Sequence, residues 1–304
     1  MEPIVPARDE VLHRCGLRAG SPVCSADMSN SVPTHPLDLA TALDGSPADE
    51  LRTARTSDAY WTFISPFGGA SAATALRAVL ERPDRDGDPL ALTVNFCAPI
   101  ERGAFAVRTR RIRANRSSQH WSVEFTQGEG AEPVLTASIV TAVRRETWSY
   151  RTSTPPSLSP WEAMQPLPKQ VALSWVDQYE FRFQEGLPAT SETMPDPPRS
   201  PRSVMWLKDA EPRELDFLSL AAMSDAFFGR IFQVIGRIPP FGTVSMTTHF
   251  HASAAELAAH GTAPLSAVVD AKVFHRSFCD QSAELYGAGG QLLATASQIA
   301  YFRV

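Results

Sequence analysis

Two short stretches of sequence decide the fold that we expect for this chain: Leu92-Thr93-Val94-Asn95-Phe96 and Met246-Thr247-Thr248-His249-Phe250. Both largely alternate apolar and polar residues, which is the pattern of a β-strand with one buried face. Phe250 follows Phe96 by 154 residues (250 − 96). The two strands are therefore expected to be copies of one another, one in each half of the chain.

Two further pairs of segments recur at almost the same distance. Asn115-Arg116-Ser117 corresponds to His275-Arg276-Ser277 at an offset of 160 residues (276 − 116), and Leu135–Val140 corresponds to Leu293–Gln298 at an offset of 158 (293 − 135). A nearly constant offset predicts a tandem duplication with small insertions in loops. Because two copies are too few for a solenoid, the halves are expected to form a pseudo-dimer within one chain.

Each copy combines one apolar helix with several antiparallel strands, so the predicted fold class is α+β. For the first half we expect a short strand at Tyr60–Phe63, a helix from Ala70 to about Arg82, and strands over 90–97, 104–114, 118–127 and 133–144. For the second half we expect strands at 179–183 and 203–207, a helix from Asp216 to about Ile235, and strands over 242–250, 265–275, 278–286 and 291–303. The repeated order of helix and strands supports the duplication.

Changes in composition suggest where the two repeats begin and end. Residues 1–36 are expected to be a flexible N-terminal extension, because most of this stretch has no periodic apolar pattern. Residues 37–150 form the first repeat. Residues 151–202 are rich in proline and are predicted to contain a connector and the start of the second repeat, and residues 203–304 form the rest of it.

The overall charge and hydropathy exclude several classes of protein. A net charge of −5 and a pI near 5.8 disfavour a large nucleic-acid or anionic-membrane surface. No apolar run approaches the length of about 18 residues that a membrane span requires, and no secretory signal pattern opens the chain. We therefore expect a cytoplasmic protein without a membrane span.

The cysteines and histidines give no metal-binding pattern, and no cofactor or metal is expected. The four cysteines have no CxxC spacing, and Cys97 and Cys279 are predicted to be buried free thiols in strands. His249 and His251 alternate along one predicted strand and so share a face. A metal pair there would have no third ligand nearby, so strand-face histidines are the favoured interpretation.

Three polar residues of the second half stand where the first half has none of their kind. Asp225 lies within the apolar segment 221–228, where a buried carboxylate costs several kcal/mol unless it is paired or hydrogen-bonded. Thr243 opens a strand, and Gln298 lies within the last one. At the matching positions the offsets place Pro89 for Thr243 and Val140 for Gln298, and no acidic residue occurs between Phe67 and Leu80.

Each of the three also has an ordinary structural interpretation. Asp225 is compatible with a solvated helix edge or a capping position. Thr243 is compatible with a common strand threonine, and Gln298 with an outward-facing strand residue. Taken together, however, the three mark a broken symmetry between the copies, and such a break points to the half that holds a functional site.

Four segments in this order resemble the type II acyl-CoA thioesterases, which are tandem, or double, hotdog proteins. They are Phe67–Ala73, the Ser224-Asp225 helix, Gly242–His251 and Gly289–Gln298. The resemblance covers roughly residues 37–304. It implies a double hotdog in which the two repeats form a pseudo-dimer, and it implies that Asp225, Thr243 and Gln298 orient a water molecule for attack on a thioester.

The chemistry of these side chains is consistent with that role. Asp225 would accept a proton from the water, provided that burial raises its pKa toward the working pH. Thr243 and Gln298 would fix the water by hydrogen bonds. Gly68 and Gly69 open the helix of the other copy and are candidates for the oxyanion or acyl pocket. The expected partner is an acyl-CoA or another acyl-thioester, in lipid metabolism.

Other interpretations remain open at this point. The basic strand with Arg108, Arg110, Arg111, Arg113 and Arg116 could contact the phosphates of coenzyme A, or it could be a solvated edge strand. A hotdog protein that binds acyl-thioesters or converts a polyketide-like substrate without hydrolysis is the main alternative function, and a scaffold is another. Homo-oligomers through a sheet edge or helix back are possible. An α/β-hydrolase is disfavoured, because the chain has no Gly-x-Ser-x-Gly motif.

Overall fold

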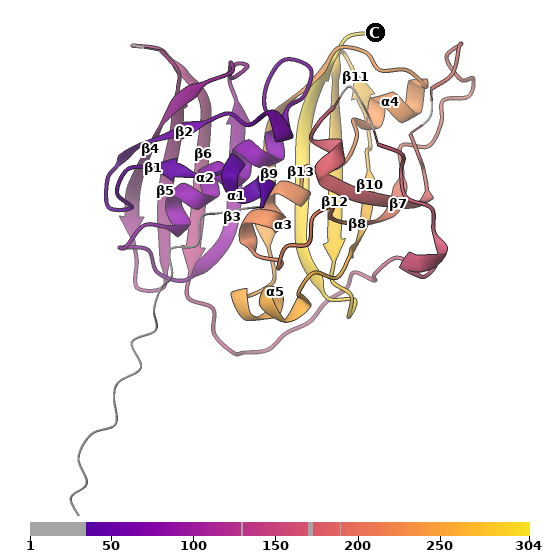
Figure 1. Cartoon of the computed structure of the whole chain (residues 1–304). Helices are drawn as coiled ribbons and strands as arrows, with labels where there is room; N and C mark the ends of the chain where they lie inside the picture. The colour runs from indigo at the N-terminus through magenta and orange to yellow at the C-terminus, as the bar shows by residue number, and fades with distance from the viewer. Residues whose placement is uncertain (1–34, 129, 170–172, 189) are drawn as a thin grey trace, which may run out of the picture. The chain divides into compact units, whose positions relative to one another are not determined.

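A computed structural model of the chain describes residues 35–128, 130–169, 173–188 and 190–304 (Figure 1). The predicted N-terminal extension falls almost entirely outside these residues. Within them, the two halves repeat one order of elements, with two strands before the main helix and a run of strands after it. No helix among the described residues combines the length and hydrophobicity that crossing a bilayer requires.

The first half contains a short helix, a long apolar helix and six strands. They are α1 (Pro36–Ala40), β1 (Leu43–Asp44), β2 (Leu51–Arg55), α2 (Gly68–Leu80), β3 (Asp88–Phe96), β4 (Ala104–Ala114), β5 (Ser118–Thr126) and β6 (Pro133–Ala142). The second half contains β7 (Tyr179–Glu185), β8 (Ser203–Asp209), α3 (Phe217–Met223), α4 (Arg230–Ile235), β9 (Phe241–Phe250), α5 (Ala254–His260), β10 (Leu265–Asp270), β11 (Phe274–His275), β12 (Phe278–Tyr286) and β13 (Leu292–Phe302).

One antiparallel sheet runs through both halves. Its strand order is β1-β2-β4-β5-β6-β3-β9-β13-β12-β10-β8-β7, and β11 pairs with β12 outside this path. The six strands on each side of the β3–β9 contact correspond in chain order. The sheet is therefore two six-stranded halves joined edge to edge, as expected of a double hotdog.

The β3–β9 contact lies on the pseudo-twofold axis that relates the halves. Thr93 is directly opposite Thr247, and their hydroxyl oxygens are 3.0 Å apart. These two residues are also separated by the 154-residue offset of the repeat, so each is opposite its own copy. An antiparallel pair in which equivalent residues face each other is the geometry of a symmetric dimer, and this confirms the pseudo-dimer predicted from the sequence.

Helices α2 and α3 cover one face of the sheet and supply much of the core. Figure 1 shows α2 and α3 beside each other on that face, and the two helices pack together. Nearly every side chain of α2 and all of α3 are buried. The close packing depends on small residues. A Cβ atom at Gly69 would overlap the carbonyl oxygen of Ala222 in α3, so the N-terminal turn of α2 could not approach α3 with a larger residue there.

Two of the predicted elements differ in the structure because of local hydrogen bonds. Tyr60–Phe63 is not a strand. Asp58–Tyr60 forms a 3₁₀ helix whose first turn is capped by the Ser57 side chain, and Trp61 then makes an isolated bridge to Pro66. The predicted strand 265–275 is divided into β10 and β11, since the backbone N–H groups of Lys272 and Val273 donate to the Asp280 carboxylate between them.

The predicted helix from Asp216 to Ile235 is also interrupted. Helix α3 ends at Met223, and a turn over Ser224–Gly229 leads to α4. The buried guanidinium group of Arg230 donates to the carbonyl oxygen of Phe228 at 2.9 and 2.6 Å, which fixes the end of the turn. The apolar spacing continues through the break because the turn is buried as well, so the pattern alone did not locate it.

The prediction for the two cysteines is half correct. Cys279 is buried in β12, but Cys97 is exposed and lies just beyond the end of β3 at Phe96. The backbone N–H groups of Cys97 and Ala98 both donate to the carbonyl oxygen of Val134 in β6, so the regular pairing of β3 with β6 ends there. Cys97 therefore contributes nothing to the core.

Candidate active site

The turn between α3 and α4 places Asp225 at the interface of the two halves. Its carboxyl group is buried, with the residue 8% exposed. Because Asp225 follows the end of α3, its side chain is free to point toward the sheet and toward the N-terminus of α2, rather than along the helix surface. The sequence predicts that Asp225 lies in the interior of a helix, but in the structure it lies in the turn that follows α3.

Gln298 on β13 is the main partner of this carboxyl group. Its Nε2 donates to Asp225 Oδ1 at 2.7 Å, and its Oε1 accepts hydrogen bonds from Gln281 Nε2 at 3.0 Å and from the Thr243 hydroxyl at 3.4 Å. The amide also lies 3.4 Å from the Met246 sulfur. Gln298 is only 3% exposed, so the interpretation of it as an outward-facing strand residue is wrong.

Thr243 reaches the cluster from a β-bulge in β9. Ser245 is paired with Ile299 and Thr243 with Ala300, so Val244 has no opposite residue and the strand bends between them. The same bulge occurs in β3, where pairing shifts between Pro89 and Ala91. The structure thus brings all three residues selected from the sequence to one place.

The N-terminus of α2 contacts the same carboxyl group from the first half. A Cβ atom at Gly68 would lie 2.6 Å from Asp225 Oδ2, so only glycine leaves room for the carboxylate. The backbone N–H of Gly69 interacts with Asp225. The first N–H groups of a helix have no acceptor within the helix and favour negative charge. The N-terminus of α2 can therefore stabilise a carboxylate.

Burial controls the protonation of Asp225. Loss of solvent raises the pKa of this carboxyl group from its ordinary value of 3.8 to about 7, opposed by the hydrogen bonds from Gln298 and from the Gly69 N–H. Tyr179 on β7 is near enough for the charge on Asp225 to raise the pKa of its phenol. A carboxyl group with a pKa near neutrality can both take up and release a proton at neutral pH.

The first half has an apolar cluster at the equivalent place. Because Leu92 pairs with Ile139 and Met246 with Gln298, the residue that corresponds to Gln298 is Ile139, and the offset there is 159 residues (298 − 139). The expected counterpart, Val140, is wrong by one residue. The identical triplets Thr136-Ala137-Ser138 and Thr295-Ala296-Ser297 already contained the correct register. Ile139 is fully buried in the core.

Sequence reasoning missed a fourth polar residue of the cluster, Gln281. It lies on β12 directly opposite Gln298 and is 2% exposed. Its counterpart on β5 is Trp121, which is directly opposite Ile139. The offset of 160 residues found for the neighbouring segment relates Trp121 to Gln281 (281 − 121), so that comparison would have identified the exchange of an indole for an amide.

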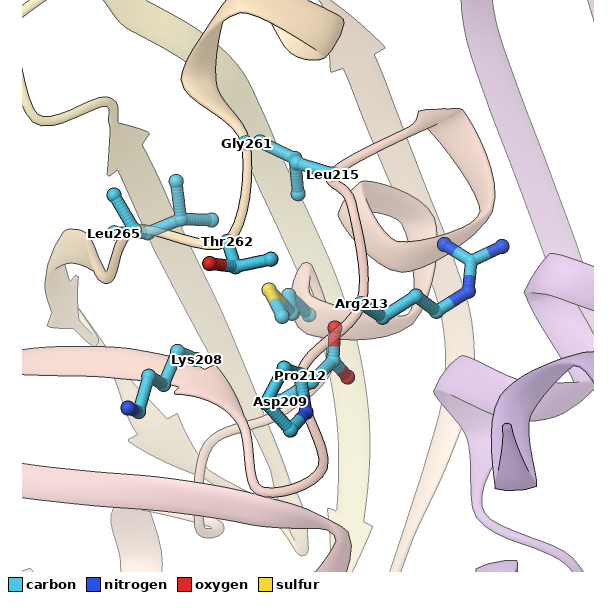
Figure 2. Close-up of a pocket in the computed structure, with 10 residues that line it drawn as sticks. Lys208, Asp209, Pro212, Arg213, Leu215, Gly261, Thr262 and Leu265 are labelled. Carbon is cyan, nitrogen blue, oxygen red and sulfur yellow. The ribbon is translucent and has the colours of Figure 1, made fainter. Parts of the chain in front are cut away.

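A second buried carboxyl group, Asp209, lies in a small cavity of about 50 Å³ away from this cluster (Figure 2). Burial raises its pKa to about 7, and the Ser219 hydroxyl donates to it at 3.3 Å. Figure 2 shows the Arg213 guanidinium directed away from Asp209, and it is bound by Asp38 and Asp216 instead. The Arg213 contacts form an ion-pair network between α1 and the start of α3.

Other chemically capable residues lie apart from the cluster. His251 follows β9, and His249 is exposed near its end. Among the described residues, no group of three or more His, Cys, Asp or Glu side chains is arranged to hold a metal ion. Strand β2 pairs only with the first half of β4, from Ala104 to Arg108. The arginine side chains of β4 are exposed: Arg108, Arg110, Arg111 and Arg113.

Comparison with known proteins agrees with this architecture. Residues 57–142 match the family described as the acyl-CoA thioesterase N-terminal domain, and residues 155–302 match the acyl-CoA thioesterase C-terminal domain. No curated protein sequence matches the chain significantly.

Two solved structures illustrate the range of similarity. A conserved hot dog fold protein of unknown function from Alicyclobacillus acidocaldarius is 34% identical, with a TM-score of 0.82, and the match covers 90% of this chain and 99% of that one. An acyl-CoA thioesterase II from Mycobacterium marinum is 14% identical, with a TM-score of 0.68, and the match covers 88% of this chain and 98% of that one. At the lower identity the likeness concerns the fold.

The fold therefore places the molecule among the double hotdog proteins. The two family matches, one to each half, are more specific. The chain belongs to the type II acyl-CoA thioesterase family, and it is accordingly a thioester hydrolase that acts on acyl-CoA.

Proposed function

We propose that the protein hydrolyses acyl-CoA thioesters at a single site, with a water molecule activated by Asp225, Thr243 and Gln298. The observation on which this depends most is the 2.7 Å hydrogen bond between Gln298 and the buried Asp225, in the one half of the pseudo-dimer where these positions are polar. The equivalent place in the first half is filled by Ile139 and Trp121, neither of which can accept a proton from a water molecule.

The reaction needs no covalent enzyme intermediate, because a thiolate is a good leaving group. The Asp225 carboxylate accepts a proton as the water oxygen attacks the thioester carbonyl carbon. Thr243 and Gln298 hold the water by hydrogen bonds and so lower the entropic part of the barrier. The tetrahedral intermediate then collapses, the C–S bond breaks, and Asp225 returns the proton to the departing thiolate. The products are a carboxylic acid and free coenzyme A.

The N-terminus of α2 is proposed to stabilise the oxyanion. The N–H groups of Gly68 and Gly69 are at the positive end of a 13-residue helix that meets the Asp225 carboxylate. In this proposal the Asp225 carboxylate lies at the N-terminus of α2 before the substrate binds. Once Asp225 has taken the proton and is neutral, the N–H groups are available to the oxyanion that forms next to it.

The acyl chain is proposed to lie along the apolar surfaces that border the site. Phe96 is close enough to contact any side chain placed at Gly68, and the ring of Phe67 stacks on Trp175 with centroids 4.4 Å apart. Phe228 follows Asp225 in the same turn and packs against Trp175 and Phe181. Hydrophobic and aromatic surfaces of this kind suit an acyl chain.

The test is release of free thiol from a panel of acyl-CoAs of increasing chain length, with the wild type beside Asp225→Ala. Removal of a working general base is expected to lower turnover by about 10²–10⁴-fold. Asp209→Asn is the matched control, because Asp209 is also a buried carboxyl group with a pKa raised to about 7 but lies outside the cluster. This control should retain wild-type turnover.

The alternative outcomes separate the competing interpretations. Turnover that survives in Asp225→Ala places the chemistry elsewhere in the protein. No release of thiol by the wild type from any acyl-CoA, with binding retained, favours a hotdog protein that binds or converts acyl-thioesters without hydrolysis.

A further inference from the structure

Gln281 is a buried glutamine that the proposed reaction does not use directly, yet it lies between a helix terminus and Gln298. Its Oε1 accepts a hydrogen bond from the backbone N–H of Arg230 at 2.6 Å, and its Nε2 donates to Gln298 Oε1 at 3.0 Å. We propose that Gln281 is a positioning residue, which holds the side-chain amide of Gln298 in the orientation that directs its N–H group at Asp225. This inference rests on the proposed hydrolytic site.

The orientation is set by a group that can only donate. Arg230 is the first residue of α4, and its backbone N–H has no acceptor within the helix. The oxygen of the Gln281 amide must therefore face Arg230, which leaves the NH₂ group of Gln281 to face Gln298. Gln298 must in turn present its oxygen to Gln281 and its NH₂ group to Asp225. One backbone N–H thus determines the direction of every hydrogen bond up to the carboxylate.

Burial removes the alternatives to this orientation. Gln281 is 2% exposed and Gln298 is 3% exposed, so bulk water cannot replace a lost partner. If the Gln298 amide were turned over, its oxygen would face the Asp225 carboxylate and its NH₂ group would face the NH₂ group of Gln281. A buried polar group without a partner costs about 1–3 kcal/mol, and here both contacts would become repulsive.

The fold does not require a polar side chain at this position. Trp121 and Ile139 form the equivalent cross-strand pair in the first half, and both are buried in the core there. An apolar pair is therefore compatible with this pair of strands. The amide pair of the second half is explained by the site that it supports, rather than by the sheet.

The orientation has a consequence for the titration of Asp225. The hydrogen bond donated by Gln298 lowers the pKa of that carboxyl group and partly offsets the effect of burial. The other groups that face Asp225 are the Gly69 N–H of α2, which also lowers the pKa, and Tyr179 of β7, whose phenol senses its charge. Without Gln281, a reoriented Gln298 would no longer stabilise the carboxylate, and the pKa of Asp225 should rise.

The test compares Gln281→Met with Gln119→Met. Gln119 is a buried glutamine on β5, two residues from the counterpart of Gln281, and it bonds to Asp84 and Asp86, away from the site. We expect Gln281→Met to lower kcat about 10-fold, as for one misdirected hydrogen bond to a charged group, with little change in KM. The pH midpoint of kcat should move upward in this variant only. Gln281→Leu serves as a second variant if the methionine substitution prevents folding.

A double-mutant comparison with Gln298→Met identifies the route of the effect. If Gln281 acts through Gln298, adding Gln281→Met to Gln298→Met should cause no further loss of kcat. Losses that multiply, or a pH midpoint equal to that of the wild type, would overturn the proposal and leave Gln281 with a packing role only.

A readout that does not depend on turnover separates this proposal from the proposed function. The pKa of Asp225 can be measured by ¹³C NMR of its carboxyl carbon in the wild type and in Gln281→Met. If the wild type hydrolyses no acyl-CoA, the proposed function fails, but a higher Asp225 pKa in Gln281→Met still supports the positioning role. An unchanged pKa contradicts it whatever the activity.

Discussion

Replacement of Asp225 by asparagine is expected to remove activity and at the same time to raise the stability of the protein relative to the wild type as the pH increases. In the folded protein, burial raises the pKa of this carboxyl group to about 7, compared with 3.8 for an exposed group. The folded state therefore binds the proton more tightly than the unfolded state. The resulting stabilisation is complete below about pH 4 and is lost as the pH rises through about 7.

The size of the effect follows from the shift in pKa. A difference of about three units between the folded and unfolded states corresponds to about 4 kcal/mol once the pH exceeds 7, at 1.36 kcal/mol per unit. Between pH 5 and pH 8.5, where part of the shift has already taken effect, the contribution of Asp225 changes by about 2–3 kcal/mol. Asparagine does not titrate, so its contribution stays constant over this range.

The assay is urea unfolding of the wild type and of Asp225→Asn at pH 5 and at pH 8.5. The asparagine oxygen can still accept the hydrogen bond from Gln298, but its NH₂ group would face the Gly69 N–H at a cost that does not depend on pH. That cost cancels when the two pH values are compared. The stability of Asp225→Asn relative to the wild type is expected to rise by about 2–3 kcal/mol from pH 5 to pH 8.5, as the linkage between protonation and folding requires.

Two results would refute this reasoning. A stability difference between the variant and the wild type that is the same at both pH values would mean that Asp225 does not titrate between them in the folded state. A difference that falls with pH would mean that the charged carboxylate is stabilising. Asp209→Asn should show the same rise, because burial raises the pKa of Asp209 to about 7 as well, but it should retain activity.

Three further predictions concern the same site. The kcat of the wild type is expected to rise with pH to a plateau above about 7 as Asp225 becomes ionised, and a pH–rate profile that is flat from pH 5 to pH 8.5 would contradict Asp225 as the base. Thr243→Val keeps the shape of the side chain without its hydroxyl, so kcat should fall about 10-fold at unchanged melting temperature, and an unchanged kcat would exclude Thr243 from water binding. Gly69→Ala should destabilise the fold by at least about 1–3 kcal/mol, because the new Cβ would overlap the Ala222 carbonyl, whereas Gly242→Ala, where a Cβ meets nothing, should leave the melting temperature nearly unchanged.

Much of the fold could be predicted because its signals are local. Apolar alternation depends on neighbouring residues, and it located the strands after each helix to within a few residues. The 154-residue offset between the two central strands is the one that separates Thr93 from Thr247, which are paired on the pseudo-twofold axis. The comparison of the two halves also selected Asp225, Thr243 and Gln298, which the structure brings together, although their catalytic role stays a prediction.

The parts that the sequence did not reveal depend on partners far along the chain. The break after α3 is stabilised by contacts of Asp225 with Gln298, 73 residues later, and no local pattern marks it. The sequence comparison assigned Val140 instead of Ile139 as the counterpart of Gln298. An alignment error of one residue exchanges the buried and exposed faces of a strand, since alternate residues point to opposite faces. The exchange of Trp121 for Gln281 could have been found at the 160-residue offset, but the link of Gln281 to the site follows only from the residue opposite it, Gln298.

The sequence by itself determined the duplication, the α+β double hotdog and the half of the chain in which polar residues replace apolar ones. The duplication, the α+β class and the polar half follow from periodicity and from the identity of residues at equivalent positions, whereas the hotdog architecture follows from the resemblance to the type II acyl-CoA thioesterases. Only the tertiary structure decided the protonation of Asp225 and the direction of the hydrogen bonds that reach it. Those depend on burial, on the N-terminus of α2 from the other half, and on a backbone N–H at the start of α4, and none of these can be assigned before the chain is folded.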